Sequence, residues 1–148
     1  MLKSYIWSYE DFLKRKCPAS SLLYDLNIMQ SITIFDLNGF NLGLWNKKTI
    51  NILKQIAKMS SDYYPEVLHK LFICNAPMVF TGVFTLIKAW LDETTKKKIQ
   101  VLGSNYFGKL SECIDDDQIP TFLGGKNETR GIDEVGPWIE YELIDSPN

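Results

Sequence analysis

Histidine is nearly absent from this sequence, which carries one, His69, in 148 residues. A single imidazole excludes a histidine-rich metal site and leaves at most one catalytic imidazole. Cysteine is also scarce: Cys17, Cys74 and Cys113 lie far apart, and no CxxC pair occurs. That spacing fits neither a disulfide framework nor a zinc site, so three reduced thiols in a cytosolic protein and no metal are expected.

An excess of charge of one sign is missing as well. Sixteen Lys and Arg residues stand against eighteen Asp and Glu residues, which gives a formal net charge of -2. Such a chain has no global attraction to nucleic acid, so no nucleic-acid partner is expected. Hydrophobic residues make up 45% of the chain and charged residues 23%, the balance of one folded domain.

Motifs of catalysis are missing too. The sequence has no G-x-S-x-G and no G-x-G-x-x-G segment. Gly125-Lys126 lacks the rest of a phosphate-binding loop, and the acidic run 115–117 lacks the spacing of a calcium loop. His69 next to an apolar run is better explained as a surface histidine than as a catalytic base for Cys74. We therefore do not expect an enzyme.

Helical and extended patterns alternate along the chain. Apolar residues spaced by three and four predict helices, and β-branched runs closed by turn residues predict strands. The predicted strands cover residues 31–37, 71–75 and 99–102. The predicted helices cover residues 1–16, 46–62, 77–91 and 110–113, with Pro18 ending the first and Asp92 capping a brief further helix. This alternation favours an α/β fold with parallel strands and right-handed crossover helices.

The helix expected after Pro77 is apolar on every face. Charged residues are missing between Lys70 and Lys88, but Asn75-Ala76-Pro77 divides that run, so a membrane span is not expected. A helix of this kind is either a central core helix or one that faces a lipid or another ligand. The pattern alone leaves both interpretations open.

Several short segments in order resemble one known family. They are Ile34–Gly39, Tyr63–Glu66, Leu71–Pro77, Leu91–Asp92, Lys98–Ser104, Leu123–Gly125 and Gly136–Trp138. Together they resemble the CRAL-TRIO lipid-binding domain of the secretory phosphatidylinositol/phosphatidylcholine transfer proteins, from the first residues to about Trp138. The resemblance implies a mixed sheet that floors a deep apolar pocket, with a mobile gate helix over its mouth at about Met78–Lys98.

The same resemblance implies a function without catalysis. Such proteins withdraw one phosphatidylinositol or phosphatidylcholine molecule from a membrane and exchange it at another as the gate opens. No cofactor is implied, and the bound phospholipid is the only ligand. The resemblance also implies a cytoplasmic protein that associates transiently with the Golgi or other membranes and takes part in phosphoinositide signalling. The alternative is a lipid-sensing or protein-interaction module that does not transfer lipid.

Site residues follow from the resemblance by position. The inositol-lipid headgroup contacts match Glu66, Thr95 and Lys98, where an ammonium and a hydroxyl can donate to phosphate and a carboxylate can accept from inositol hydroxyls. The choline-lipid contacts match Tyr9, Ser31 and Thr33. The acyl-chain contacts in the gate match Phe80, Val83, Phe84, Ile87 and Leu91. For the first group the plain alternative is ordinary surface charge, and for the second it is strand propensity and core packing.

The chain also departs from the family. The N-terminal helical region and the first strands of the sheet are absent, so residues 1–148 are expected to form the C-terminal part of the domain. Ala89 and Glu93 stand where relatives often have proline. A three-stranded sheet with an open edge would also tend to pair with another chain.

Overall fold

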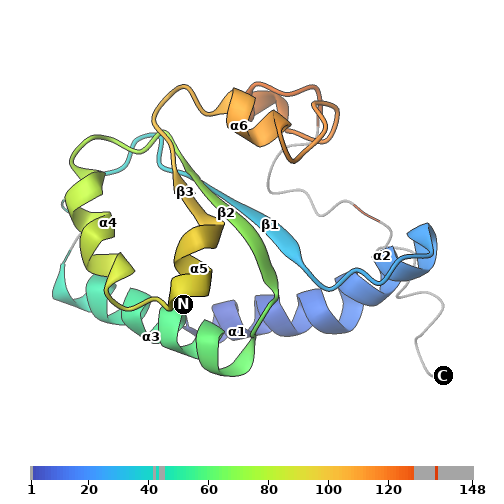
Figure 1. Ribbon diagram of the computed structural model, residues 1–148, viewed down its shortest axis with the longest axis horizontal. Coiled ribbons are helices and arrows are strands. Elements are labelled where there is room, and N and C mark those ends of the chain that lie inside the picture. Colours follow the sequence, from blue (N-terminus) through green and yellow to red (C-terminus); the bar gives the residue numbers. More distant parts are fainter. Residues whose placement is uncertain (1, 42, 44–45, 129–135, 137–148) are drawn as a thin grey trace. The chain divides into compact units, whose positions relative to one another are not determined.

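A computed structural model describes residues 2–41, 43, 46–128 and 136 (Figure 1). The chain divides into two compact units. One comprises Lys3–Met29 together with the chain from Phe107 onward, and the other comprises Gln30–Tyr106. Of the segments that carry the family resemblance, only Pro137-Trp138 lies outside the described residues.

A parallel three-stranded sheet forms the centre of the second unit (Figure 1). Its strands are β1 (Ser31–Asp36), β2 (Leu68–Cys74) and β3 (Ile99–Val101), in the order β1-β2-β3. Thr33 pairs with Leu71, and Leu71 with Ile99. The register shifts between Ser31 and Ile32, where β2 has one extra residue. The α/β fold with parallel strands is confirmed, although β2 begins three residues earlier than predicted.

Helices connect these strands. The link from β1 to β2 is α3 (Lys47–Tyr63), and its N-cap Asn46 accepts hydrogen bonds from the backbone N–H groups of Lys48 and Thr49. Between β2 and β3 lie α4 (Phe80–Lys88) and α5 (Glu93–Lys98). The predicted helix 77–91 is therefore too long at both ends. Pro77 precedes a turn in which its carbonyl accepts from the N–H of Phe80 at 2.8 Å.

One face of the sheet packs against α4. Phe80, Val83 and Phe84 form a buried cluster with Ile73 of β2. Partly buried residues around them come from the strands and loops: Leu37, Phe40, Leu71, Ala76, Ile87, Ile99 and Val101. Leu71 and Ile73 share a face because side chains alternate along a strand. That face of β2 and β3 is therefore the one that α4 covers.

The first unit begins with a continuous helical segment, so the prediction that Pro18 ends the helix is wrong. α1 (Leu2–Asp11) passes through the π-helical turn η1 (Phe12–Lys16) into α2 (Cys17–Tyr24). Pro18 lies in the first turn of α2, directly after the π turn. The wider π turn before it leaves room for the proline ring.

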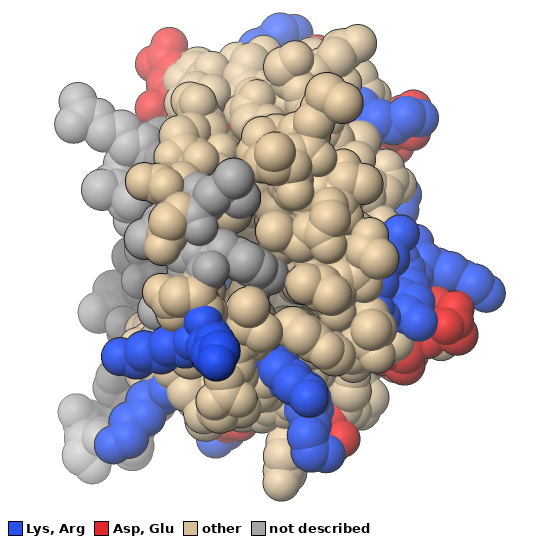
Figure 2. All heavy atoms as spheres, turned by 90° about the vertical axis from the view of Figure 1, so that its left-hand side faces the viewer, with Lys and Arg blue, Asp and Glu red and all other residues tan. Residues whose placement is uncertain are grey.

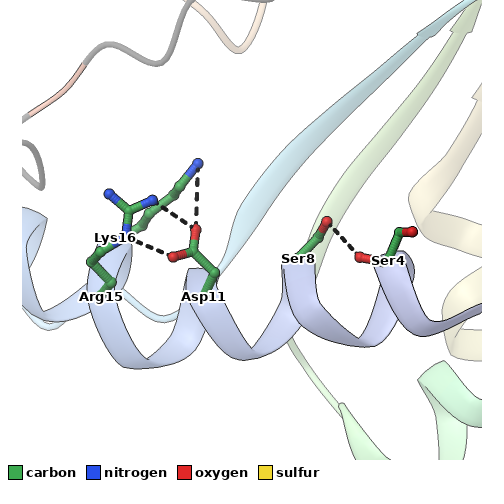
Figure 3. A network of polar contacts seen from close by, with 5 residues as sticks. All are labelled: Ser4, Ser8, Asp11, Arg15 and Lys16. Atoms are coloured by element: carbon green, nitrogen blue, oxygen red, sulfur yellow. Dashed lines mark hydrogen bonds and ion pairs between the residues drawn. The ribbon is translucent and has the colours of Figure 1, made fainter.

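A partly buried ion pair crosses the junction between α1 and η1 (Figure 3). The carboxylate of Asp11 accepts from Nε of Arg15 at 2.6 Å and from Nη2 at 3.0 Å. Lys16 places its ammonium 3.7 Å from the same carboxylate. This two-point geometry fixes the side chains on one turn of the segment.

The rest of this unit is short and irregular. It contains α6 (Phe107–Ser111) and the 3-10 turn η3 (Thr121–Leu123), with Leu110 and Ile119 fully buried. The predicted helix 110–113 is thus displaced by a few residues. Gly125 follows η3, and any Cβ at that position would overlap the carbonyl of Ile119. This close approach accounts for the second glycine of Leu123–Gly125.

Candidate functional site

The amino-terminal edge of the sheet gathers polar side chains from distant parts of the chain. Gln30 comes directly before β1, Glu66 lies in the turn before β2, and Lys98 comes directly before β3. Parallel strands begin at the same edge, so this arrangement follows from the topology. Two of the three residues expected at an inositol headgroup, Glu66 and Lys98, are therefore brought together.

An ion pair joins those two residues. Nζ of Lys98 lies 2.9 Å from Oε2 of Glu66. The lysine side chain is only 20% exposed, whereas the glutamate side chain is 72% exposed. Such pairs contribute little net stability, because water competes for the exposed partner. An anionic ligand could therefore displace Glu66 from a cation that the protein holds largely out of water.

Thr95 lies one helical turn before Lys98 on α5, which places it on the same side of that helix. Its hydroxyl donates to Oδ2 of Asp92 at 2.6 Å, and its backbone N–H donates to Oδ1 at 2.8 Å. These hydrogen bonds, the hydroxyl first, lower the pKa of the Asp92 carboxyl. Because the Thr95 proton is committed to Asp92, the hydroxyl offers a ligand its lone pairs rather than its proton.

The N-cap of α5 is tied to α3 as well. Ser61 on α3 donates to Oδ2 of Asp92 at 3.4 Å, a long and weak hydrogen bond. Sequence reasoning identified Asp92 as a cap but missed its contact with Ser61. It also missed Gln30, whose side-chain amide donates to the carbonyl of Glu66 at 2.8 Å. No sequence motif predicts either contact, because both depend on which elements the fold places side by side.

Ser31 and Thr33 alternate along β1 and therefore point to the same face of the sheet. The register pairs Thr33 with Leu71, so this is the face that α4 covers on β2 and β3. The next residue on that face of β1, Phe35, is 52% exposed. The two hydroxyls thus lie on an apolar sheet surface that α4 leaves partly uncovered.

Tyr9, the third residue expected at a choline headgroup, belongs to the other compact unit. It lies on α1, and its ring centroid is 4.8 Å from that of Tyr5, with the rings tilted by 40°. An aromatic pair of this kind presents ring faces suited to a quaternary ammonium group. Its place in a headgroup site stays a prediction.

Helix α4 has two apolar sides in different surroundings. Phe80, Val83 and Phe84 are buried, whereas Leu86 is 53% exposed. Met78, in the turn before the helix, is 94% exposed. Figure 2 shows the side of the molecule on which α4 lies, with uncharged residues across its upper middle and lysine and arginine side chains below and beside them. The helix is therefore not a fully buried core helix, because one of its sides packs on the sheet and the other is exposed.

The residues expected in the gate differ in their surroundings in the same way. Ile87 is half-buried and packs against the cluster of Phe80, Val83 and Phe84. Leu91 lies beyond the end of α4, in a turn where its N–H donates to the carbonyl of Lys88 at 3.2 Å. In this structure the side chains of α4 pack on the sheet themselves. An acyl chain could lie between them and the sheet only after α4 moved outward.

The connection into α4 is tightly held at the carboxyl ends of the strands. Asn75 has a φ of 52°, in the left-handed region, and its side-chain amide donates to Oδ1 of Asp36 at 2.8 Å. The N–H of Ala76 donates to the carbonyl of Leu102 at 2.9 Å. Residues of all three strand ends therefore fix the point from which α4 departs.

The described part of the chain offers no support for a metal site or for Cys74 as a nucleophile. Within it, no group of three His, Cys, Asp or Glu side chains could hold a metal ion. Burial raises the pKa of the Cys74 thiol to about 11, with a smaller contribution from Asp36. His69 is exposed on β2. A buried neutral thiol is a poor nucleophile.

Comparison with known proteins gives consistent matches. The family model described as the CRAL/TRIO domain matches residues 5–125. The phosphatidylinositol/phosphatidylcholine transfer protein SFH11 of Arabidopsis thaliana is 36% identical over 97% of this chain and 40% of its own length. The Sec14 cytosolic factor of Schizosaccharomyces pombe is 38% identical over 97% of this chain and 51% of its own length.

A solved structure agrees with these matches. The crystal structure of Sfh5 superimposes with a TM-score of 0.60 at 28% identity, over 80% of this chain and 42% of that one. The chain thus spans about half, or less, of the length of the proteins it matches.

Proposed function

The chain belongs to the CRAL/TRIO domain family, and from this premise we propose that it binds one phosphatidylinositol or phosphatidylcholine molecule and exchanges it between membranes. The contact of Lys98 with Glu66 carries this proposal. It joins two of the residues expected at an inositol-lipid headgroup, and Thr95 lies one turn away. Relatives whose names state transfer of these two lipids match almost the whole chain.

The inositol headgroup would use charge and hydroxyl chemistry together. Lys98 would donate to the phosphate, and the displaced carboxylate of Glu66 would accept from inositol hydroxyls. Thr95, whose proton is engaged by Asp92, would accept a further inositol hydroxyl. The exchange of partners keeps the largely covered lysine paired, which avoids the cost of an uncompensated charge.

The choline lipid would use a different set of groups. Ser31 and Thr33 would donate to its phosphate from the sheet face. A quaternary ammonium group binds well on an aromatic ring, and by the family resemblance that ring is Tyr9. Neither hydroxyl carries a charge, so this site would suit a zwitterionic headgroup. One chain would then accept two lipid classes at separate headgroup positions.

Helix α4 would act as the gate. Its buried face would leave the sheet, and two acyl chains would take its place in contact with Ile73 and its neighbours. Burial of hydrocarbon is worth about 0.8 kcal/mol per CH₂, so release of lipid into water would be negligible. Opening would therefore have to occur at a membrane.

This function needs no catalytic group and no cofactor besides the lipid. The relative from Schizosaccharomyces pombe is named a cytosolic factor. In the described residues, every helix is too short or too polar to cross a bilayer. By the family resemblance, we extend the proposal to a cytoplasmic protein that binds Golgi or other membranes transiently and supplies lipid for phosphoinositide signalling.

Native mass spectrometry of the purified protein tests the proposal. We expect one phosphatidylinositol or phosphatidylcholine molecule per chain, identified after denaturation. Transfer of labelled lipid between vesicles then separates a carrier from a lipid sensor, because a sensor retains its lipid without exchange. A folded protein that neither holds nor transfers either lipid would contradict the proposal.

A further inference from the structure

The side-chain amide of Gln30 reaches across the amino-terminal edge of the sheet. Its Nε2 donates to the main-chain carbonyl of Glu66 at 2.8 Å, although 36 residues separate the two. Gln30 lies directly before β1, and its neighbour Ser31 donates its N–H to the carbonyl of Val67, also at 2.8 Å. Gln30 and Ser31 therefore donate hydrogen bonds to the consecutive carbonyls of Glu66 and Val67.

Glu66 needs such support because its backbone is unusual. Its φ is 64°, in the left-handed region that residues with a Cβ rarely adopt. A conformation of this kind persists only where surrounding contacts hold it. Here the amide of Gln30 holds the carbonyl of Glu66, and Lys98 holds its carboxylate.

The direction of the Glu66 side chain depends on that conformation. With φ near 64°, its carboxylate meets the ammonium of Lys98 at 2.9 Å. A return of Glu66 to the ordinary helical or extended region would rotate its Cα–Cβ bond and carry the carboxylate away from Lys98. Ser31 keeps its own backbone bond to Val67 in either case.

We infer that Gln30 is a positioning residue for headgroup selection: it fixes the backbone of Glu66, so that the carboxylate stays within reach of the inositol hydroxyls once the phosphate takes its place at Lys98, and this favours phosphatidylinositol over phosphatidylcholine. The inference rests on the proposed function, because it concerns the headgroup site of that same lipid exchange. Gln30 need not touch the lipid. It acts through the conformation of Glu66, and the choline-lipid hydroxyls of Ser31 and Thr33 do not depend on its amide.

Substitution of Gln30 by methionine tests this inference, since methionine has a similar length and no N–H donor. We expect Gln30→Met to lower phosphatidylinositol transfer roughly two- to tenfold, the range of one hydrogen bond, and to leave phosphatidylcholine transfer unchanged. Gln30→Glu, which also lacks the donor, should act in the same direction. Gln118→Met is the matched control, because Gln118 is another exposed glutamine, and its side-chain amide donates to its neighbour Asp117 at a long 3.4 Å.

A double substitution separates this role from general weakening of the fold. In a Lys98→Ala background, Gln30→Met should have no further effect on phosphatidylinositol transfer, because without Lys98 the phosphate no longer holds the headgroup beside Glu66. An equal loss of both lipids, an unchanged ratio, or additive effects with Lys98→Ala would each overturn the inference alone. If the unsubstituted protein transfers neither lipid, the proposed function itself is wrong and the inference falls with it.

Discussion

Lys98 and Glu66 are 32 residues apart in the sequence, yet Nζ of one lies 2.9 Å from Oε2 of the other. The two side chains differ in their surroundings, since the lysine is largely covered and the glutamate is largely in water. The lysine is therefore the fixed partner, and the movable one is the carboxylate of the glutamate, on a backbone that Gln30 holds. An anionic headgroup that replaced the glutamate would find a cation already in position.

The first prediction concerns the fixed partner. Lys98→Ala should lower phosphatidylinositol transfer roughly tenfold to a hundredfold, because a charge-assisted hydrogen bond to the phosphate is lost. Phosphatidylcholine transfer should stay unchanged. A vesicle transfer assay with each labelled lipid measures both, and Lys97→Ala, an exposed neighbour on the same helix, is the matched control. Equal loss of the two activities would show that Lys98 does not read the inositol headgroup.

The second prediction concerns the cap of α5. Asp92→Ala removes the acceptor for the N–H and hydroxyl of Thr95, and should lower the free energy of unfolding by about 0.5–2 kcal/mol. Asp92→Asn keeps a capping oxygen and should cost less. Urea denaturation of the three proteins measures the difference.

The acidity of Asp92 gives this stabilisation a pH dependence. Its pKa is lowered in the folded protein, so the folded state binds the proton less readily than the unfolded state. The contribution is then present above the ordinary carboxyl pKa of 3.8 and lost as the pH falls through the lower folded value. The unfolding curves of the wild type and Asp92→Ala should therefore converge at low pH. A gap that widened on acidification would contradict the assigned direction of the pKa.

Local patterns predict most of the sheet but not the ends of the helices. The β-branched run at 31–37 places β1 within one residue, because the turn residues Asn38-Gly39 end it. The prediction that Pro18 ends the first helix is wrong, because the π turn η1 removes the clash that would end an ordinary helix. Helix α4 is shorter than its apolar run, because Pro77 and Leu91 take part in turns instead.

The candidate site could be predicted only in part. The spacing of Glu66 and Lys98 in the sequence does not predict their contact, since it depends on the order of β2 and β3 in the sheet. The family resemblance identified both residues. The role of Asp92 as a cap follows from the sequence. The contact of Gln30 with Glu66 follows from no pattern, because it needs both the start of β1 and the left-handed turn at Glu66.

The third prediction concerns Cys74, which is fully buried and has a pKa raised to about 11. At about pH 8 its thiol is protonated and covered, so iodoacetamide should modify it only after unfolding. Cys113 is half-buried and should react first in the native protein. Peptide mapping at increasing urea concentrations follows both. Rapid modification of Cys74 in the native protein would show that the strand end opens far below the unfolding transition.

The fourth prediction concerns the buried side of α4. Phe84 packs in the cluster with Ile73, and its ring centroid lies 6.2 Å from that of Phe80. Phe84→Ala should lower the free energy of unfolding by about 3–5 kcal/mol, because it removes a large buried side chain. Thermal and chemical denaturation measure this loss. A change below about 0.5 kcal/mol would mean that α4 is not closed on the sheet in solution.

The fifth prediction concerns the opposite side of the same helix. Leu86 is 53% exposed, so Leu86→Ser should change the free energy of unfolding by less than about 0.5 kcal/mol. If the exposed side of α4 enters the bilayer when the gate opens, the same change should slow vesicle-to-vesicle transfer of both lipids roughly fivefold to tenfold, because apolar contact with the membrane is lost. Thr85→Ser, at an exposed polar position beside it, is the control and should change neither quantity. Slower transfer at equal stability separates membrane contact from packing, since a packing defect would appear in the unfolding curve as well. Unchanged transfer by Leu86→Ser would place the membrane-facing surface elsewhere than on this side of α4.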